Sequence, residues 1–472
     1  MRDAAPPDAV AAPLATVVVD TTHPGAPIPG TFLGISCEWS SVTKYLGDGA
    51  GGANPAVVRL LSAFAAEGNH PTLRIGGNSA DEAWWNPAGA TPRPANVTID
   101  LGPAQVSTLA VLQAALGAML IPDLDLALQG AYTDAASNAE GLVQALLAAL
   151  PTGAVRAFEL GNEPDLWSKN GLRPSTYLYA DWKNEYDAFT AALGALVVPA
   201  PPFAAPALSG TSWLSDLDDL CSAEKSNLSL ATAHRYPFNV CNGKAPPAVA
   251  DLLADAAGQT MAMVFAPHVA AARRAGVDFR LGETNTVACS GADGVSNVYA
   301  AALWGADVAF QLASIGAVGL NFHTPGSYYG VFTASGTSAG VQPLYYGMRL
   351  FSIAVPAGAA LAGATVSPPL DRLHDWATVG PDGQTRVALL NLDPGHGGTV
   401  TVKVAGASAA TAIRLHAATI DARDGITLGG QTWDGSTDGS PQGIAVTESL
   451  PVSQGTSTIP LPPLDAVVVT LR

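Results

Sequence analysis

The sequence predicts a closed barrel of eight parallel β-strands with helices outside it, followed by a C-terminal antiparallel β-sandwich. Three observations predict this fold. Short apolar runs alternate with longer amphipathic ones from about residue 30 to residue 350, and eight such units fit a (β/α)8 barrel. After about residue 354 the helical periodicity disappears and β-rich segments bounded by Gly, Pro, Asp and Ser replace it. At 472 residues the chain is also too long for one ordinary core.

The elements of the barrel follow from this alternation. The expected strands are short and apolar, and they lie at residues 30–39, 72–76, 125–129, 154–161, 203–208, 229–234, 278–282 and 317–323. The expected helices are amphipathic and lie at residues 55–67, 106–119, 138–150, 177–193, 214–221, 247–275, 295–315 and 344–353. An open doubly wound sheet is the competing fold, but it usually carries a Gly-rich nucleotide loop. The Gly-rich segment 47–52 precedes no Lys-Ser/Thr pair, so the closed barrel is favoured.

The sandwich is expected to have strands at residues 386–392, 399–404, 411–415 and 466–471. The strand at 16–20 precedes the barrel and has no helix of its own, so we expect it to join the sandwich and tie the two ends of the chain together. The alternative is two independent domains with a loose linker. The predicted division is a loose leader at 1–13, the N-terminal strand at 14–24, the barrel at 25–353 and the sandwich at 354–472.

Composition excludes several classes of partner. The net charge is −17, from 39 acidic and 22 basic residues, which argues against binding to nucleic acid or to an anionic membrane. No uninterrupted apolar run reaches the roughly 18 residues that a membrane span needs. Residues 1–13 lack the basic start and apolar core of a signal peptide. We expect a monomer that is secreted or periplasmic if a signal was removed, and cytoplasmic otherwise.

The four cysteines are too few for a disulfide framework, and their spacings match no zinc pattern. Cys221 and Cys241 flank one loop and could pair, while Cys37 and Cys289 each follow an expected strand end. Isolated buried thiols are the alternative for all four. Neither a metal nor an organic cofactor is expected.

Two glutamates mark the candidate site. Glu163 follows an apolar strand within Gly-Asn-Glu-Pro, and Glu283 closes a second strand about 120 residues later. In a barrel of parallel strands both lie at the carboxyl-terminal face, where the reactive groups gather. A pair of carboxylic acids in that position is what acid/base and nucleophile chemistry on a glycosidic bond requires.

Other polar and aromatic side chains are expected at the same face. A sugar presents hydroxyl groups at its edge and C–H groups on its faces, which suits such a set. The candidate substrate-binding residues are Glu38, Asn78, Asp81, Trp85, Gln129, Asn162, Tyr236, Asn285, His323 and Tyr328. Burial without a ligand is the alternative for Gln129 and His323, and packing of a loop is the alternative for Trp85.

Several segments carry a family resemblance. Residues 158–165 (Phe-Glu-Leu-Gly-Asn-Glu-Pro-Asp) and 281–285 (Leu-Gly-Glu-Thr-Asn) resemble the clan A retaining glycoside hydrolases. With the supporting segments 73–78, 233–237 and 295–304, the chain is similar to glycoside hydrolase family 79, the β-glucuronidase and heparanase family. The similarity extends over the whole chain. It implies a carbohydrate substrate, with Glu163 as the acid/base and Glu283 as the nucleophile.

The resemblance also implies binding roles. Asn162 would bind the sugar 2-hydroxyl, Glu38 other hydroxyls, and Tyr328 the uronate carboxylate. One departure matters, because several relatives place a second tyrosine five residues after the nucleophile, where this chain has Ala288.

The expected activity is therefore a retaining exo-β-glycosidase, with a glucuronide as the preferred substrate. The alternatives are a neutral sugar (a glucoside, galactoside or xyloside), a substituted uronate that needs the extra room, an endo-acting heparanase-like enzyme, and a non-catalytic carbohydrate-binding protein.

Overall fold

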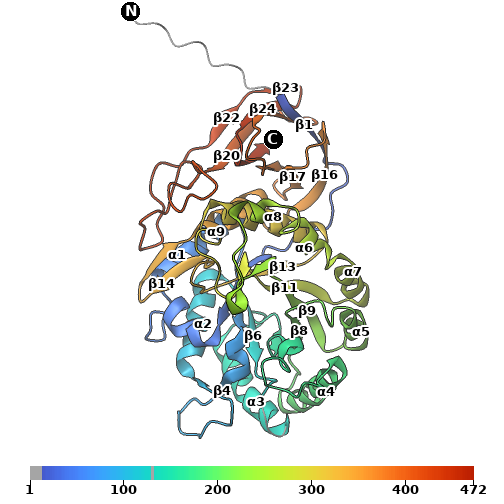
Figure 1. Ribbon diagram of the computed structural model, residues 1–472, viewed down its shortest axis with the longest axis vertical. Coiled ribbons are helices and arrows are strands. Elements are labelled where there is room, and N and C mark those ends of the chain that lie inside the picture. The colour runs from blue at the N-terminus through green and yellow to red at the C-terminus, as the bar shows by residue number, and fades with distance from the viewer. Residues whose placement is uncertain (1–12, 129–131) are drawn as a thin grey trace, which may run out of the picture.

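Eight parallel strands form a closed barrel in the computed structural model, which describes residues 13–128 and 132–472 (Figure 1). The ring follows chain order and closes where the last strand pairs with the first. Its strands are β2 (Leu33–Glu38), β3 (Thr72–Gly76), β6 (Met119–Leu124), β7 (Phe158–Leu160), β8 (Phe203–Leu208), β9 (Leu228–His234), β11 (Asp278–Thr284) and β13 (Gly319–His323). The predicted barrel is thus confirmed.

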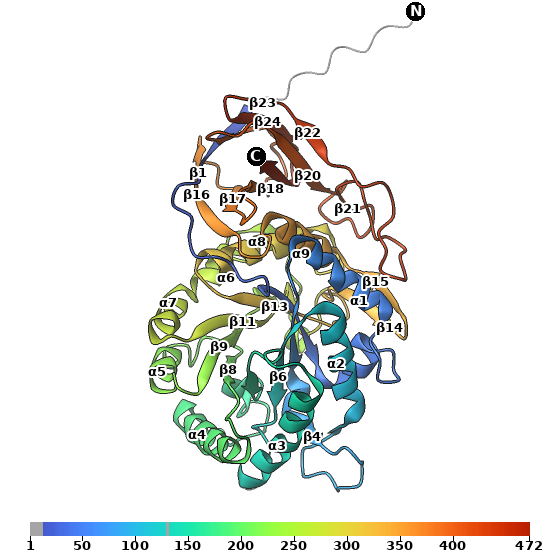
Figure 2. The same ribbon diagram turned by 180° about the vertical axis from the view of Figure 1, so that it is seen from behind.

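Helices surround the barrel, as Figures 1 and 2 show. They are α1 (Pro55–Ser62), α2 (Pro103–Leu116), α3 (Tyr132–Ala149), α4 (Tyr179–Leu196), α5 (Asp216–Ala223), α6 (Gln259–Met263), α7 (Ala266–Ala275), α8 (Tyr299–Ser314) and α9 (Pro343–Ala354). Local sequence explains their ends. The Asn54 side chain accepts hydrogen bonds from the first turn of α1, and Pro55 needs no partner for an N–H group there. None of the helices in the described ranges is long and apolar enough to cross a membrane.

Two predicted elements differ from the structure. The third barrel strand is β6 at Met119–Leu124, whereas the sequence pattern predicts it at 125–129. Helix α2 ends at Leu116 because the next residue, Gly117, has a left-handed φ of 61°. The apolar residues that follow can therefore form a strand. The expected long helix at 247–275 is broken into a 3-10 turn, α6 and α7, because Pro267 can start a helix but cannot continue one.

The second domain is one continuous path of hydrogen-bonded strands that folds over a core of its own. The strand β16 connects its layers, because residues 360–362 pair with β17 and residues 363–367 pair with β1. The main strands are β1 (Pro13–Asp20), β16 (Ala360–Ser367), β17 (Leu373–Val379), β18 (Thr385–Asn391), β19 (Gly398–Val404), β20 (Ala410–His416), β24 (Thr456–Leu461) and β25 (Ala466–Leu471). Short strands β21 (Thr427–Leu428), β22 (Glu448–Leu450) and β23 (Val452–Ser453) complete it.

The N-terminal strand joins this domain, as the sequence predicts. Val17 and Val19 of β1 are buried in the sandwich core while Val18 points outward, the alternation expected of a strand with one covered face. Strand β1 runs antiparallel to β16 but parallel to β19, so the domain is not purely antiparallel. Pro13 already belongs to β1, and the rest of the predicted leader lies outside the described residues.

The two domains meet across α8 and α9, which lie between the barrel and the sandwich in both views (Figures 1 and 2). Residues 299–313 of α8 are all buried, because this helix is covered on one side by the barrel and on the other by the second domain. The Tyr299 hydroxyl donates to the Leu415 carbonyl, and the His374 ring contacts Asp307 at 2.7 Å. The sandwich therefore supports the barrel on the flank formed by its last two helices.

Short two-stranded pairs lie in the loops outside the barrel. They are β4 (Ala83–Trp85) with β5 (Ile99–Leu101), β10 (Phe238–Asn239) with β12 (Val287–Ala288), and β14 (Phe332–Ser335) with β15 (Ser338–Val341). The β10–β12 pair is part of the candidate site described next.

Candidate active site

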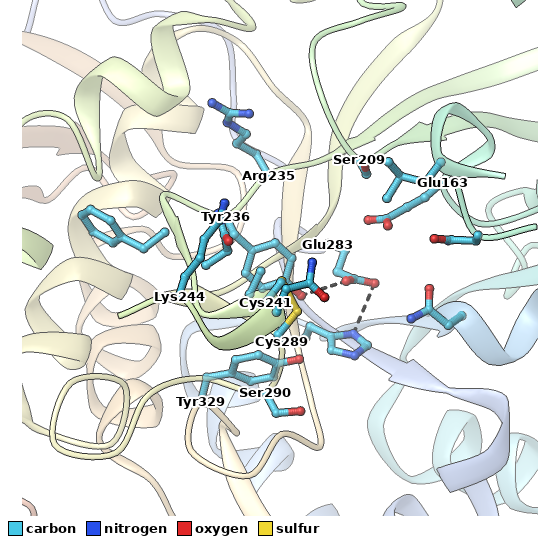
Figure 3. A pocket seen from close by; sticks show the side chains of 18 of the residues that line it. Glu163, Ser209, Arg235, Tyr236, Cys241, Lys244, Glu283, Cys289, Ser290 and Tyr329 are labelled. Atoms are coloured by element: carbon cyan, nitrogen blue, oxygen red, sulfur yellow. Dashed lines mark hydrogen bonds and ion pairs between the residues drawn. A yellow bond between two sulfur atoms is a disulfide. The ribbon is translucent and has the colours of Figure 1, made fainter. Parts of the chain in front are cut away.

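A cavity of about 900 Å3 opens where the barrel strands end (Figure 3). Its floor holds Glu283, and Glu163 lies on its wall. The volume is within the range of about 300–1,000 Å3 that is typical of small-molecule sites. Polar and charged side chains dominate the lining, as expected for a site that binds a hydroxyl-rich ligand.

Glu283 is held by donors on both oxygens. The Tyr236 hydroxyl donates to Oε1 at 2.8 Å, and Arg74 Nη1 donates to Oε2 at 3.0 Å. His323 Nδ1 lies 3.3 Å from Oε2. Burial alone would raise the pKa of this carboxyl group, but His323, His234 and Arg74 lower it to about 2. Glu283 is therefore an oriented carboxylate that stays ionised across the physiological range.

Glu163 lies in the opposite electrostatic environment. It starts the 3-10 turn Pro164–Leu166 with φ 49°, a left-handed conformation that is uncommon for a residue with a side chain and is often found at functional sites. Burial raises the pKa of its carboxyl group, and the charge of Glu283 adds to this, against a lowering by His234. One buried acid is thus driven toward its protonated form beside another that is driven toward its ionised form.

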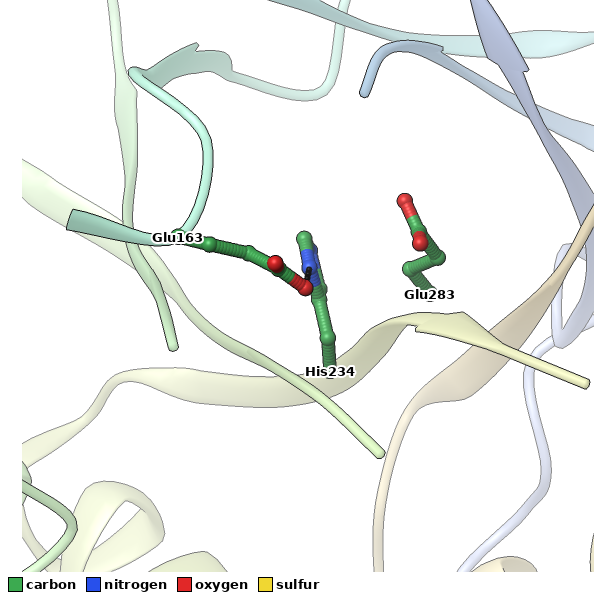
Figure 4. Close-up of side chains that lie close together, drawn as sticks. All are labelled: Glu163, His234 and Glu283. Carbon is green, nitrogen blue, oxygen red and sulfur yellow. Dashed lines mark hydrogen bonds and ion pairs between the residues drawn. The ribbon is translucent and has the colours of Figure 1, made fainter. Parts of the chain in front are cut away.

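The two glutamates face each other across a short gap (Figure 4). One carboxylate oxygen of each and one ring nitrogen of His234 all lie within 4.8 Å of one another. Retaining glycosidases hold their carboxyl groups about 5–5.5 Å apart, and inverting ones about 6.5–9.5 Å apart. The separation therefore fits direct attack by one carboxylate better than a mechanism that places a water molecule between them.

The same three side chains could also offer ligands to a cation. However, Arg74 already pairs with Glu283 Oε2, His323 Nδ1 lies 3.3 Å from the same oxygen, and the Tyr236 hydroxyl donates to the other oxygen. The donor set therefore fits the carboxyl pair better than a metal ion.

His234 is a site residue that sequence reasoning did not single out, although it lies in the segment 233–237 that carries the family resemblance. It ends β9, is fully buried, and its Nδ1 lies 3.1 Å from Glu163 Oε1. Burial alone would lower the pKa of His234, but Glu283 and Glu163 raise it. His234 therefore orients the Glu163 carboxyl group, and its position at a strand end was the available signal.

Arg74 connects the site residues beneath the cavity floor. Besides Glu283 it binds the Asn162 Oδ1 at 2.9 Å and the Glu159 Oε2 at 2.5 Å. Asn162 is buried, and its Nδ2 donates to Asn78 Oδ1 at 3.0 Å; within residues 13–128 and 132–472 no second acceptor binds this Nδ2. Arg74 thus fixes the nucleophile candidate and the neighbouring amide in one network.

Four of the predicted binding residues line the cavity: Glu38, Asn78, Tyr236 and His323. Glu38 is anchored, because its carboxylate accepts hydrogen bonds from the backbone N–H groups of Asn78 and Ser79 at 3.2 and 2.8 Å. The His323 ring lies between Glu38 and Glu283. Its Nε2 is 3.7 Å from Glu38 Oε1, and its Nδ1 is 3.3 Å from Glu283 Oε2. Glu38 and His323 thus form the part of the wall where β2 and β13 lie side by side.

Three predicted residues instead support the site from outside the cavity. Asp81 is buried and accepts hydrogen bonds from the Asn162 N–H and from Trp167 Nε1. Trp85 packs on α3, where the Asn138 amide binds both its backbone N–H and its C=O. Asn285 donates to the carbonyls of His323 and Tyr329 and so ties the ends of β11 and β13 together. Gln129 lies outside the described residues.

Tyr328, the predicted carboxylate-binding residue, and its neighbour Tyr329 lie differently in the structure. Tyr328 is 40% exposed and does not line the cavity, whereas the adjacent Tyr329 does. The Tyr329 ring lies 6.0 Å from the Tyr236 ring and 5.9 Å from the His323 ring. Successive residues in an extended segment point to opposite sides, so an error of one residue exchanges an outward side chain for an inward one.

A disulfide forms the rim opposite Glu163. Cys241 is bonded to Cys289, which joins the loop after β10 to the loop after β12. Neither suggested pair, Cys221 with Cys241 or Cys37 with Cys289, is present, and Cys37 and Cys221 are buried thiols. Ala288 lines the cavity next to this bridge, so no ring occupies the position where relatives place a tyrosine.

Comparison with known proteins gives matches in both domains. The glycosyl hydrolase family 79 C-terminal beta domain matches residues 375–468. A β-glucuronidase of Neurospora crassa is 25% identical over 372 residues, which cover 70% of this chain and 64% of the relative. A β-glucuronidase of Aspergillus niger is 26% identical over 407 residues, which cover 78% and 72%. The chain thus spans roughly two thirds of the length of these relatives.

Solved structures match the whole fold. A 4-O-α-L-rhamnosyl-β-D-glucuronidase of Fusarium oxysporum has a TM-score of 0.73 and 23% identity, covering 97% of this chain and 100% of that one. A family 51 arabinofuranosidase of Xanthomonas axonopodis has a TM-score of 0.71 and 18% identity, covering 97% and 99%. The matched C-terminal domain and the two β-glucuronidase relatives confirm the resemblance to glycoside hydrolase family 79, and the solved structures share the barrel-and-sandwich fold.

Proposed function

We propose that this protein is a retaining exo-β-glycosidase, a β-glucuronidase that hydrolyses β-D-glucuronides by double displacement. The observation that carries the proposal is the carboxyl pair. Glu163 and Glu283 have oxygens within 4.8 Å, and their pKa values are driven in opposite directions. Two carboxyl groups with separated pKa values are the acid and the nucleophile that glycoside hydrolysis needs. The glucuronide is supported by the two β-glucuronidases among the relatives.

In the first step Glu283 attacks the anomeric carbon, and a covalent glycosyl-enzyme forms. Arg74 and Tyr236 point the carboxylate and keep it ionised. Glu163, protonated because it is buried beside a second negative charge, gives its proton to the leaving oxygen. The aglycone then departs past Glu163.

In the second step water replaces the aglycone. Glu283 is now an ester and carries no charge, so one of the causes that raised the pKa of Glu163 is gone. Glu163 therefore becomes a better base and removes a proton from the water that attacks the anomeric carbon. In this proposal the Asn162 amide, held by Arg74, binds the sugar 2-hydroxyl through its second Nδ2 hydrogen.

For the uronate carboxylate we propose Tyr329 as the main hydroxyl donor. It lines the cavity on the same side as Ala288, Cys289 and Ser290. With alanine at 288, the donor that relatives place there is missing. This open position also favours a second candidate, a glucuronide with a further substituent, and the Fusarium structure with a like fold is an enzyme whose substrate name includes a rhamnosyl group.

A panel of nitrophenyl β-glycosides tests the proposal. The glucuronide, glucoside, galactoside and xyloside are compared by kcat/KM, and the anomer of the first sugar released is followed by proton NMR. We expect the glucuronide to be cleaved fastest, with release of the β-anomer. A faster neutral glycoside would overturn the uronate assignment alone, and release of the α-anomer would overturn the retaining mechanism.

A further inference from the structure

Two buried polar atoms near the carboxyl pair lack a hydrogen-bond partner within residues 13–128 and 132–472. They are His234 Nε2 and Glu159 Oε1, and neither side chain is exposed. The second polar atom of each side chain is bound. His234 Nδ1 lies 3.1 Å from Glu163 Oε1. Glu159 Oε2 accepts from Arg74 Nε at 2.5 Å. Buried polar atoms in folded proteins are almost always bound by the protein or by ordered water, so these two atoms need a partner.

Both atoms face one small gap beside Gly282, which precedes Glu283 in β11. A Cβ atom at position 282 would lie 3.4 Å from His234 Nε2 and 3.5 Å from Glu159 Oε1. Among the other described residues, the flanking ones aside, no heavy atom would lie closer to it. The gap thus holds no side chain, and the two polar atoms border it without bonding to each other.

The two atoms have complementary hydrogen-bonding roles. Glu159 pairs with Arg74 through Oε2, so Oε1 is a carboxylate oxygen that can only accept. His234 Nε2 carries a hydrogen when the ring is an imidazolium, and also when the neutral ring accepts a proton of Glu163 at Nδ1. In both forms Nε2 is a donor. One water molecule can accept from Nε2 and donate to Oε1, which satisfies both atoms at once.

We propose that one buried water molecule in the gap beside Gly282 bridges His234 Nε2 to Glu159 Oε1. Glu159 thereby acts as a positioning residue for Glu163, through the water and the histidine ring. The bridge keeps a hydrogen on Nε2, so Nδ1 is the atom that faces the Glu163 carboxyl group in both steps of the reaction. Because this role concerns the acid/base of a double displacement, it rests on the proposed function.

The bridge should affect the proton affinity of the acid/base. Burial and Arg74 lower the pKa of His234, but Glu283 and Glu163 raise it. The Glu159 carboxylate, acting through the water, also favours the imidazolium. Burial raises the pKa of Glu163, whereas the His234 ring lowers it. Without the bridge the neutral ring is favoured, so the lowering weakens and the pKa of Glu163 should rise.

Gly282→Ala tests the bridge, because a methyl group makes ordinary contacts there and fills the space that the water needs. Gly282 has no left-handed φ, so alanine fits its backbone. The alkaline limb of kcat/KM against pH for an aryl β-glucuronide should move up by about 0.5–1 pH unit, because Glu163 keeps its proton longer. At acidic pH, kcat for an activated aryl glucuronide should fall about three- to tenfold, because the second step needs ionised Glu163.

The matched control is Gly194→Ala in α4. There a Cβ atom would lie 3.4 Å from Ala200, so the same change is made away from the site and the pH profile should not move. Glu159→Gln should move the alkaline limb in the same direction as Gly282→Ala. The double variant should move it no further than the larger single shift, because both changes break one link.

A high-resolution crystal structure of wild type observes the bridge directly and needs no activity. We expect one ordered water within about 2.7–3.2 Å of both His234 Nε2 and Glu159 Oε1, and none there in Gly282→Ala. Clear density without that water, or a Gly282→Ala pH profile like that of wild type, would overturn the bridge and leave the glucuronidase proposal standing. Failure of wild type to cleave any β-glycoside would instead overturn the proposed function, and with it the role of Glu159.

Discussion

Two buried arginines on barrel strands show how differently the two ends of the barrel are built. Arg74, near the carboxyl end, is surrounded by acids and binds Glu159, Asp123 and Glu283 at 2.5, 3.3 and 3.0 Å. Burial would lower its pKa, but the three carboxylates raise it above an already high ordinary value. The Arg74 guanidinium is thus paired with several carboxylates, one of which is the proposed nucleophile Glu283.

Arg280, at the amino end, has no carboxylate partner among the described residues. Its guanidinium donates to the Asn321 side chain and to the carbonyls of Thr31, Phe32 and Leu320. Burial, together with the nearby Arg156, lowers its pKa to about 9, so it stays charged at neutral pH. Here the arginine satisfies backbone carbonyls and closes the barrel floor.

A buried charge in this barrel is thus coupled to other charges at the carboxyl end, where the proposed chemistry lies, and bound by neutral groups at the amino end. At the carboxyl end a substitution should change the ionisation of its neighbours and therefore the reaction. At the amino end it should change the free energy of unfolding and leave the reaction intact.

The largest effect is expected for Glu283→Gln. An amide cannot form the glycosyl-enzyme, so turnover should fall by at least about a thousandfold with every substrate. The thermal midpoint should change little by comparison, because glutamine can keep the hydrogen bond from Tyr236. Steady-state kinetics and thermal unfolding of the same preparation measure both. Near-native activity would show that the nucleophile is another residue.

A somewhat smaller and selective effect is expected for Glu163→Ala. Loss of the proton donor should slow glycosides with poor leaving groups by about a hundred- to ten-thousandfold, because general acid catalysis contributes this much. Activated nitrophenyl glycosides need little protonation and should be affected less. Added azide should restore part of the second step and give a glycosyl azide. Equal losses for both kinds of leaving group, without azide rescue, would contradict the assignment.

Tyr329→Phe should change which sugar is preferred. A hydrogen bond to a charged group contributes about 1.5–3 kcal/mol, so kcat/KM for the glucuronide should fall about ten- to hundredfold relative to the glucoside. The adjacent Tyr328→Phe is the matched control, because Tyr328 is exposed and outside the cavity, and the ratio should stay as in wild type. If Tyr328→Phe shifts the ratio and Tyr329→Phe does not, the placement of these two rings is wrong.

The smallest catalytic effect is expected for Arg280→Met. The change removes a buried cation and leaves the carbonyls of Thr31, Phe32 and Leu320 without their donor. The free energy of unfolding should fall by about 1–3 kcal/mol, as for other buried groups that lose a partner. The kcat/KM of the folded protein should not change. A loss of activity without a loss of stability in urea unfolding would show that Arg280 contributes to the reaction and not only to folding.

The sequence was sufficient for the features that depend on periodicity. Strands β3 and β8 lie at the predicted residues, and the glutamates at the ends of β7 and β11 come together, because parallel strands of a barrel deliver their carboxyl ends to one face. The third strand is predicted too late in the chain for two reasons. Pro122 interrupts the apolar run of β6, and Asp123 and Asp125 give residues 123–129 the alternating polar and apolar pattern of a strand.

The features that depend on long-range packing could not be predicted. Which of two adjacent tyrosines faces the cavity is decided by the loop after β13, whose Tyr328 N–H donates to the Ser290 carbonyl across the site. The pairing of Cys241 with Cys289 depends in the same way on two loops that are 48 residues apart. Asp81 and Asn285 are polar residues in the right region, but local sequence does not say that their partners are the protein itself.

The most direct test of the central claim is to trap the glycosyl-enzyme. The protein is incubated with a 2-deoxy-2-fluoro-β-glucuronyl fluoride, whose good leaving group allows the first step while the fluorine slows the second. We expect time-dependent inactivation, with the added glycosyl mass on a single peptide that contains Glu283. A label on Glu163, or hydrolysis of glucuronides without any adduct, would show that Glu283 is not the nucleophile of a double displacement.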